Sequence, residues 1–310
     1  MAAKRKTRSD QQCQKQRKRP RRTEECRLDS LPESLQLHIL SFLDAKQAVQ
    51  TSVLAKSWIS LWTRTPVLRF NYIAFRKLRA FDKFVYNVLR FRDHAVKVNT
   101  LTFIRGGTSS AKVLKNVLDY AFSHGVSHLE FFIQRSRSGL WPVCPRTSSD
   151  SLKTLSLKSG NYVIRCPSLS GMFKNLAVLH LKGAVLKNLE PFSGFPMLEK
   201  LVLDDCRHAT TTMTVEATRL AYLSITSHVC RINRCHLNTP NLRLFEYVGS
   251  DLPKLITHDG LPTYVYIEER CCARGCLNGF TGIGGGGSTG VVSCDGEGVI
   301  GKHMGNQRRK

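Results

Sequence analysis

The side chains able to carry out chemistry are scattered along this sequence rather than gathered at catalytic spacings. The ten histidines show no paired metal-binding spacing, and neither a G-x-S-x-G nucleophile motif nor an H-E-x-x-H zinc motif occurs. Cys271, Cys272 and Cys276 crowd together, but no second cysteine pair stands at zinc-ligand spacing from them. We therefore predict no catalytic residue, no metal site and no cofactor.

A glycine-rich stretch imitates a nucleotide-binding loop. Gly282, Gly284 and Gly287 have the G-x-G-x-x-G spacing, which binds a phosphate when a helix follows and presents its N-terminus. No helical pattern follows here, so we reject nucleotide binding. Residues 270–310 lack an apolar period and are rich in glycine, whose ordering costs much backbone entropy, so we expect them to be disordered.

Basic charge is the densest chemical feature of the chain. The formal charge is +24, and residues 1–27 hold 11 basic and 3 acidic side chains. Two basic clusters in this segment have the spacing of a bipartite nuclear localisation signal, which an importin binds. The clusters consist of Lys4, Arg5, Lys6, Lys15, Arg17, Lys18, Arg19, Arg21 and Arg22. We predict that the protein is located in the nucleus, with the cytoplasm as a second location.

Composition also bears on two other classes of partner, nucleic acid and membranes. A basic tail is also compatible with nucleic-acid binding, but residues 1–27 contain no aromatic side chain that could stack on bases, so we do not expect it. No apolar run reaches the roughly 18 residues that span a bilayer, and the N-terminus lacks the apolar core of a signal peptide. We therefore expect no membrane association and an intracellular protein whose eleven cysteines are reduced.

Three short helices are predicted between Ser30 and Trp62. Ser30 with Glu33 and Asp44 with Gln47 have capping-box spacing, and a third apolar stretch runs from Val53 to Trp62 before Pro66. About forty residues bury little surface on their own, and these helices are apolar on more than one side. Both tryptophans are candidates for exposure, and we expect a partner to cover part of this surface.

The stretch "LPESLQLHILSFLDAKQAVQTSVLAKSWISLW" resembles a plant F-box over about forty positions without a gap. The resemblance implies docking on a Skp-type adaptor. The residues implied for the adaptor interface and the small core beside it are Leu31, Pro32, Leu35, Ile39, Leu40, Leu43, Val53, Leu54, Trp58, Leu61 and Trp62. The sequence departs from the family in two places, namely Asp44-Ala45 in place of Pro-Thr, and Ser57 in place of Arg. The second departure removes an arginine side chain and is expected to weaken a polar contact with the adaptor.

A repeat follows the helical segment. Six-residue L-x-x-L-x-L segments begin at Leu152, Leu176, Leu198, Leu220 and Leu242, at steps of 24, 22, 22 and 22 residues, and weaker members begin at Val98 and Val126. This period is that of leucine-rich repeats, which stack as parallel strands around one core. Helices are predicted from Leu78 to Leu89 and from Val113 to Phe122. Strand residues proposed to contact a target are Lys153, Ser156, His180, Lys200 and Tyr222.

The expected fold is α+β in several parts: a small helical F-box and an α/β leucine-rich-repeat solenoid, between a disordered basic N-terminus and a Gly-rich C-terminus. The expected boundaries are 1–27 for the basic tail, 28–70 for the F-box, 71–96 for a connecting helix, 97–269 for the repeats and 270–310 for the Gly-rich tail. The order is similar to that of plant F-box/LRR proteins, against which this chain looks truncated.

That resemblance implies a non-catalytic substrate-recognition subunit of an SCF-type ubiquitin ligase. The adaptor would connect the chain to a cullin, and the solenoid would bind a target protein. Two alternatives remain open. One is a nuclear LRR interaction protein, or one associated with nucleic acid, without a ligase role. The other is a truncated decoy that holds the adaptor without a target.

Overall fold

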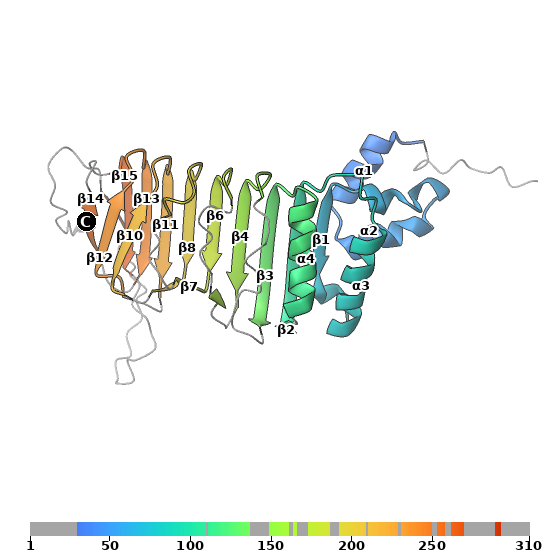
Figure 1. Cartoon of the computed structure of the whole chain (residues 1–310), viewed down its shortest axis with the longest axis horizontal. Helices are drawn as coiled ribbons and strands as arrows, with labels where there is room; N and C mark the ends of the chain where they lie inside the picture. The colour runs from blue at the N-terminus through green and yellow to red at the C-terminus, as the bar shows by residue number, and fades with distance from the viewer. Residues whose placement is uncertain are drawn as a thin grey trace, which may run out of the picture.

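The computed structural model describes residues 30–109, 111–136, 149–160, 164–165, 173–186, 192–208, 210–228, 231–249, 253–257, 262–269 and 289–292. A small helical part lies at one end of a long row of strands (Figure 1). Residues 1–29, which contain the predicted localisation signal, lie outside the described residues, as do Cys271, Cys272 and Cys276. The α+β fold class predicted from the sequence is confirmed for the helical part and the strand-rich solenoid.

Helix α1 (Glu33–Ser41) begins two residues later than a capping box at Ser30 requires. Its N-cap is Pro32, which makes no side-chain capping bond, and the Glu33 carboxylate pairs with Arg64 instead. The capping box predicted at Ser30 and Glu33 was therefore wrong. The physical reason is Pro32 itself, because a residue before proline is disfavoured in helical conformation and Leu31 could not occupy a first helical turn.

Helix α2 (Ala45–Gln50) has the predicted capping box. The Asp44 carboxylate accepts from the Gln47 backbone N–H at 2.8 Å, and the Gln47 side chain accepts from the Asp44 N–H at 3.1 Å. The Ala45 and Ala48 side chains of this helix are buried. Local capping chemistry therefore sets the start of α2 as the sequence predicted.

The third predicted helix is replaced by three 3-10 turns, namely η1 (Thr51–Val53), η2 (Lys56–Trp58) and η3 (Leu61–Arg64). Hydroxyl groups bond backbone carbonyls throughout this stretch. Thr51 donates to the Ala48 carbonyl at 2.7 Å, and Thr63 donates to the Ser60 carbonyl at 2.7 Å. Such local bonds compete with the regular helical pattern, which explains why the prediction failed here.

The main sheet has ten strands in the order β1-β2-β3-β4-β6-β8-β11-β13-β15-β16. Their bounds are β1 (Val67–Asn71), β2 (Thr100–Ser109), β3 (His128–Ser136), β4 (Thr154–Ser159), β6 (Val178–Lys182), β8 (Lys200–Asp204), β11 (Tyr222–Ser227), β13 (Leu244–Gly249), β15 (Tyr264–Glu269) and β16 (Thr289–Val292). Neighbours pair parallel except β15 and β16. Each predicted six-residue repeat segment contains the start of one of these strands, which confirms the repeat.

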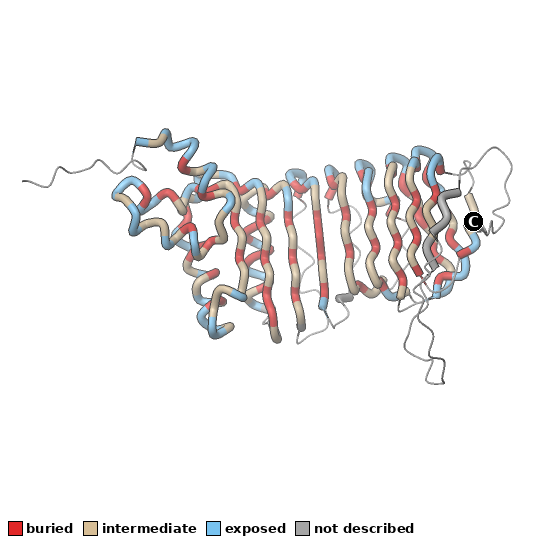
Figure 2. The backbone as a smooth tube through the Cα atoms, turned by 180° about the vertical axis from the view of Figure 1, so that it is seen from behind, coloured by how far each residue is buried: buried red, intermediate tan, exposed pale blue. Residues whose placement is uncertain are grey.

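The repeat register stacks apolar side chains into one continuous core. Leu155 pairs with Leu179, Leu179 with Leu201, and Leu201 with Leu223, all at most 3% exposed. Buried and partly exposed positions therefore alternate along the strands (Figure 2). One face of the sheet belongs to the core, and the opposite side-chain positions form what we call the open face.

A second layer covers the core face. At its N-terminal end lie α3 (Leu78–Phe91) and α4 (Ala111–Ser123), which confirm the two helices predicted there (Figure 1). Further along, small parallel sheets form on the return path of each repeat, where no strand was predicted. One sheet contains β5 (Ile164–Arg165), β7 (Ala184–Leu186) and β9 (Arg207–His208); the other contains β10 (Thr212–Glu216), β12 (Arg234–Asn238) and β14 (Lys254–Thr257).

Several polar contacts fasten the turns and layers. The buried Arg105 guanidinium of β2 donates two bonds of 2.8 Å to the Asp82 carboxylate of α3. The thiol of Cys206 donates to the Leu181 carbonyl of the preceding repeat at 3.4 Å, which gives it a structural role. Burial raises the pKa of the Cys235 thiol to about 12. Both cysteines therefore act as core residues of the solenoid.

The helical part is joined firmly to the solenoid. Trp62 packs against both its small core and the core of the solenoid. The Lys46 ammonium donates to the carbonyl of Ala74 in η4 (Tyr72–Ala74) at 2.6 Å, and the Asp93 N–H donates to the Thr63 carbonyl at 3.2 Å. The helical part is thus attached at the β1 edge of the main sheet.

The tail predicted to be disordered contains one described element. Thr289–Val292 forms β16 and pairs antiparallel with β15. Structure within residues 270–310 was not predicted, and these four residues differ from that expectation. A strand edge at β15 offers free backbone groups, and pairing with any nearby extended segment satisfies them.

Candidate functional site

Large apolar side chains are exposed on one part of the helical segment 30–64. We call this set the exposed apolar face; it consists of Leu35, Ile39, Phe42, Val53, Leu54 and Ile59, which are 40–87% exposed. Leu35, Ile39 and Phe42 stand four and three residues apart on α1 and its C-cap, so they lie along one side of the helix. Val53 and Leu54 come from η1 and its C-cap, and Ile59 follows η2.

The predicted adaptor-binding residues divide between this face and the core beneath it. Leu40, Trp58 and Leu61 are at most 5% exposed and form the small core with Ala48. Leu31, Leu43 and Trp62 are half-buried, whereas Pro32 is exposed. Leu35, Ile39, Val53 and Leu54 lie on the exposed apolar face. Which of these eleven residues touch an adaptor stays a prediction.

The two tryptophans, which the sequence made candidates for exposure, are not among the exposed side chains. Trp58 is 2% exposed, and Trp62 is half-buried between the two cores. A four-residue core needs its largest side chain inside, because an indole supplies more apolar area than any other residue. Phe42 and Ile59 were not among the predicted interface residues, although Phe42 is 69% exposed. The seven-residue spacing from Leu35 to Phe42 was the signal that could have found it.

Polar contacts fix the backbone around the exposed apolar face. The Gln36 side-chain amide donates to the Leu31 carbonyl at 3.0 Å, which holds the Leu31-Pro32 pair against α1. The Arg69 guanidinium of β1 donates to the Ser41 carbonyl at the end of α1. The apolar side chains are therefore presented by a held backbone, so little ordering entropy remains to be lost on binding.

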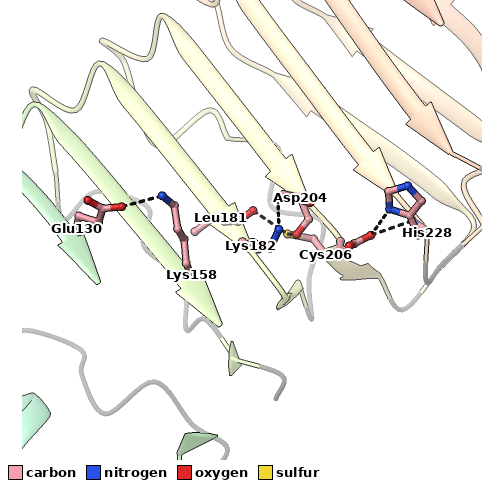
Figure 3. A network of polar contacts seen from close by, with 8 residues as sticks. Glu130, Lys158, Leu181, Lys182, Asp204, Cys206 and His228 are labelled. Carbon is pink, nitrogen blue, oxygen red and sulfur yellow. Dashed lines mark hydrogen bonds and ion pairs between the residues drawn. The ribbon is translucent and has the colours of Figure 1, made fainter. Parts of the chain in front are cut away.

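The open face of the sheet carries the second set of predicted contacts. Lys158 of β4 donates to Glu130 of β3 at 2.7 Å, and Lys182 of β6 donates to Asp204 of β8 at 2.7 Å (Figure 3). Lys158 and Lys182 are register partners on neighbouring strands. The ion pairs therefore draw the Lys158 side chain toward β3 and the Lys182 side chain toward β8.

Ser156 and His180 are also register partners, and they lie two residues before Lys158 and Lys182 on the same two strands. Ser156 is 9% exposed, and its hydroxyl oxygen and the Nε2 atom of His180 are enclosed without a hydrogen-bond partner among the described residues. Burial lowers the pKa of His180, and the nearby Lys158 lowers it further. The His180 ring is therefore held mainly neutral at physiological pH.

The other three predicted target contacts lie at the starts of strands. Lys153 precedes β4 and is exposed, and its carbonyl accepts from the Ala177 N–H at 2.9 Å. Lys200 lies over the Tyr222 ring at 4.3 Å from its centre, and the Tyr222 hydroxyl donates to Glu246. Burial raises the pKa of Tyr222, and its bond to Glu246 raises it further. A role of these residues in target binding stays a prediction.

Within the described part of the chain, His, Cys, Asp and Glu side chains do not gather in any group of three that could hold a metal ion. Over the same ranges, no helix has both the length and the apolar character that crossing a bilayer requires. The candidate sites among the described residues are the exposed apolar face and the open face of the sheet.

Comparison with known proteins agrees with this geometry. Residues 28–70 match the F-box domain family. The chain is 32% identical over 191 residues to a putative F-box/FBD/LRR-repeat protein of Arabidopsis thaliana, covering 58% of this chain and 38% of that protein. It is 25% identical over 209 residues to F-box/LRR-repeat protein 25 of the same plant, covering 66% of this chain and 77% of that protein. No solved structure matches the chain.

The fold and the matched domain define an F-box protein with a strand-rich solenoid. The domain match and the named relatives together support a plant F-box/LRR-repeat family protein. The chain spans between 38% and 55% of the length of the first three curated relatives that it matches.

Proposed function

We propose that this chain is the substrate-recognition subunit of an SCF-type ubiquitin ligase. The F-box docks on a Skp-type adaptor, the adaptor connects it to a cullin, and the solenoid binds a target protein for ubiquitination. The observation that carries the proposal is the exposed apolar face, which lies inside the matched F-box domain.

The energetics favour a protein partner for this face. Burying one large apolar side chain stabilises a complex by about 1.5–3 kcal/mol, and six such side chains are exposed between Leu35 and Ile59. Large apolar patches with this density mark interaction sites on soluble proteins. Leu40, Trp58 and Leu61 are buried in the small core, and in this proposal they support the face from beneath.

The mechanism that we propose is positional. Binding of adaptor and target to one rigid chain raises the effective concentration of target lysines near a ubiquitin-loaded conjugating enzyme. The firm junction at Trp62 and Lys46 supports such a role, because a fixed distance between the two surfaces sets the reach of the transfer. In this proposal the isopeptide bond is made by other members of the assembly, and the chain itself supplies no catalytic group.

The direct test is reconstitution with purified partners. The intact chain is mixed with a Skp-type adaptor and then with a cullin, and co-elution in size-exclusion chromatography reports assembly. We expect a ternary complex from the intact chain and none from a Leu35→Ala/Ile39→Ala variant that keeps its circular dichroism spectrum. A folded intact chain that does not co-elute with the adaptor would overturn the proposal and favour an LRR interaction protein without a ligase role.

We also propose that the chain is nuclear, on the basis of the two basic clusters in residues 1–27. A fluorescent fusion of the intact chain should accumulate in nuclei, and replacement of Lys15, Lys18 and Arg19 by Ala should abolish this accumulation. An unchanged distribution of the variant would contradict importin recognition through the clusters.

A further inference from the structure

Hydrogen-bonding groups of two adjacent strands lie near one another at the centre of the open face. The ammonium groups of Lys158 and Lys182 come from adjacent strands, and each has three N–H donors, of which one is used in its ion pair. The Ser156 hydroxyl and Nε2 of His180 lie on the same two strands, two residues before the lysines. Both atoms are enclosed and have no hydrogen-bond partner among the described residues. We call Ser156, Lys158, His180 and Lys182 the central cluster.

The arrangement favours a negatively charged group. On β3, β4, β6 and β8 the open face carries Lys158, Lys182 and Lys200 against two acids, Glu130 and Asp204. These two acids come from the outer strands and pair with the two central lysines. A carboxylate placed over β4 and β6 would have one lysine on each strand beside it.

Pre-ordering lowers the entropy cost of such binding. A free lysine side chain loses much of its conformational entropy when it is fixed, but Lys158 is 29% exposed and is already held by Glu130 at 2.7 Å. Lys182 is held in the same way by Asp204. The buried Ser156 hydroxyl adds a donor whose lack of a partner is costly in the free protein, and a bound acceptor would remove that cost.

We propose that the central cluster binds a carboxylate side chain of an acidic segment in the target protein. The inference rests on the proposed function, because it assigns the target to the open face of the solenoid. Carboxylates accept charge-assisted bonds from several donors at once, which matches two ammonium groups, a hydroxyl and an imidazole N–H. The segment would cross β4 and β6, with Lys200 available for a second acid on the segment.

His180 gives this site a pH signature. The charged groups around it are Lys158 from β4, Lys182 on its own strand, Asp204 from β8 and Glu130 from β3. A bound carboxylate favours the protonated ring and so raises the pKa of His180. Binding therefore takes up a proton, and affinity for an acidic segment should rise as the pH falls from about 7.5 toward about 6, near the ordinary histidine pKa.

The test measures binding of a twelve-residue peptide of alternating Glu and Ser to the intact chain by fluorescence anisotropy, with a Gln-for-Glu peptide as reference. Lys158→Gln/Lys182→Gln should weaken binding of the acidic peptide by about tenfold or more, since two charge-assisted contacts are lost. The matched control Lys15→Gln/Lys18→Gln removes the same charge from the basic tail and should change binding by less than about twofold.

A third variant acts in the opposite direction. Glu130→Gln/Asp204→Asn releases both lysines and should strengthen binding of the acidic peptide, while His180→Gln should abolish its pH dependence. Equal loss in the central and tail variants, no preference for the acidic peptide, or weaker binding by Glu130→Gln/Asp204→Asn would each overturn the proposal. Circular dichroism confirms folding of each variant. Adaptor co-elution of the same preparations is measured separately, so failure here is distinguishable from failure of the proposed function.

Discussion

The F-box exposes many of its large apolar side chains, whereas the solenoid buries most of its own. Of the eleven large apolar residues exposed in the described part of the chain, six lie between residues 35 and 59, and the other five are spread from residue 73 to residue 264. The solenoid closes its own core, since each repeat covers the next. The F-box core contains four fully buried apolar residues, and much of the apolar surface around it faces outward. The difference indicates where a partner is needed.

The strongest way to break this comparison is to remove the centre of the small core. Trp58 is 2% exposed and is the largest side chain of its cluster. Trp58→Ala should lower the free energy of unfolding by about 3–5 kcal/mol, because it leaves a large cavity. Chemical denaturation of the intact chain and its variant measures the change.

The matched control is Phe42→Ala, on the exposed apolar face of the same domain. Phe42 is 69% exposed, so its truncation should change the free energy of unfolding by no more than about 0.5 kcal/mol. Equal losses in the two variants would mean that Phe42 is part of the folded core, and the contrast between face and core would fail. A consequence for binding studies is that Trp58 variants report loss of folding as well as loss of contact.

A smaller effect is expected from a backbone position in the solenoid. Gly183 stands between β6 and β7 with φ of +67°, and an added Cβ would lie 3.3 Å from the Cβ and carbonyl oxygen of Ser159. Gly183→Ala should cost about 1–2 kcal/mol, because a side chain strains this left-handed conformation. Gly160→Ala is the control, since its Cβ would also lie 3.3 Å from backbone atoms but at an ordinary φ. An equal or larger loss at Gly160 would contradict the backbone explanation.

The smallest expected effect is a pH dependence of stability that comes from the solenoid. Burial lowers the pKa of His208 and of His180, both in the solenoid. The unfolded chain therefore takes up protons first as the pH falls, so stability is fully present above the ordinary histidine pKa of about 6.5 and is lost below it. Thermal unfolding should occur at lower temperature at pH 5.5 than at pH 7.5, and His208→Gln should reduce the difference. A solenoid equally stable at both pH values would contradict this expectation.

The parts of the fold that the sequence predicted correctly are those set by local patterns. The L-x-x-L-x-L segments from Leu152 to Leu242 mark strands because alternation and period are visible in a single chain. The capping box at Asp44 and the helix before Gly125, whose φ is +64°, depend on neighbouring residues alone. These elements were predictable without knowledge of what packs on them.

The parts that were missed depend on distant partners. The short strands β7, β9 and β10 have two to five residues, and their pairing is with the next repeat rather than within their own sequence. In the F-box, the change from a helix to 3-10 turns after Thr51 altered which residues face inward. For this reason Trp58 was a candidate for exposure, and Ile59 was left out of the predicted interface.

The most direct measurement of the central claim is calorimetric titration of a Skp-type adaptor into three forms of the intact chain. The first is unaltered, the second carries Phe42→Ala/Ile59→Ala on the exposed apolar face, and the third carries Tyr86→Ala/Phe91→Ala on α3. The two altered pairs are similarly exposed, at 69% and 57% against 53% and 62%. We predict a loss of affinity of about tenfold or more for the second form and of less than about twofold for the third. Undiminished binding by the second form, or equal losses in both, would contradict docking through the exposed apolar face of the F-box.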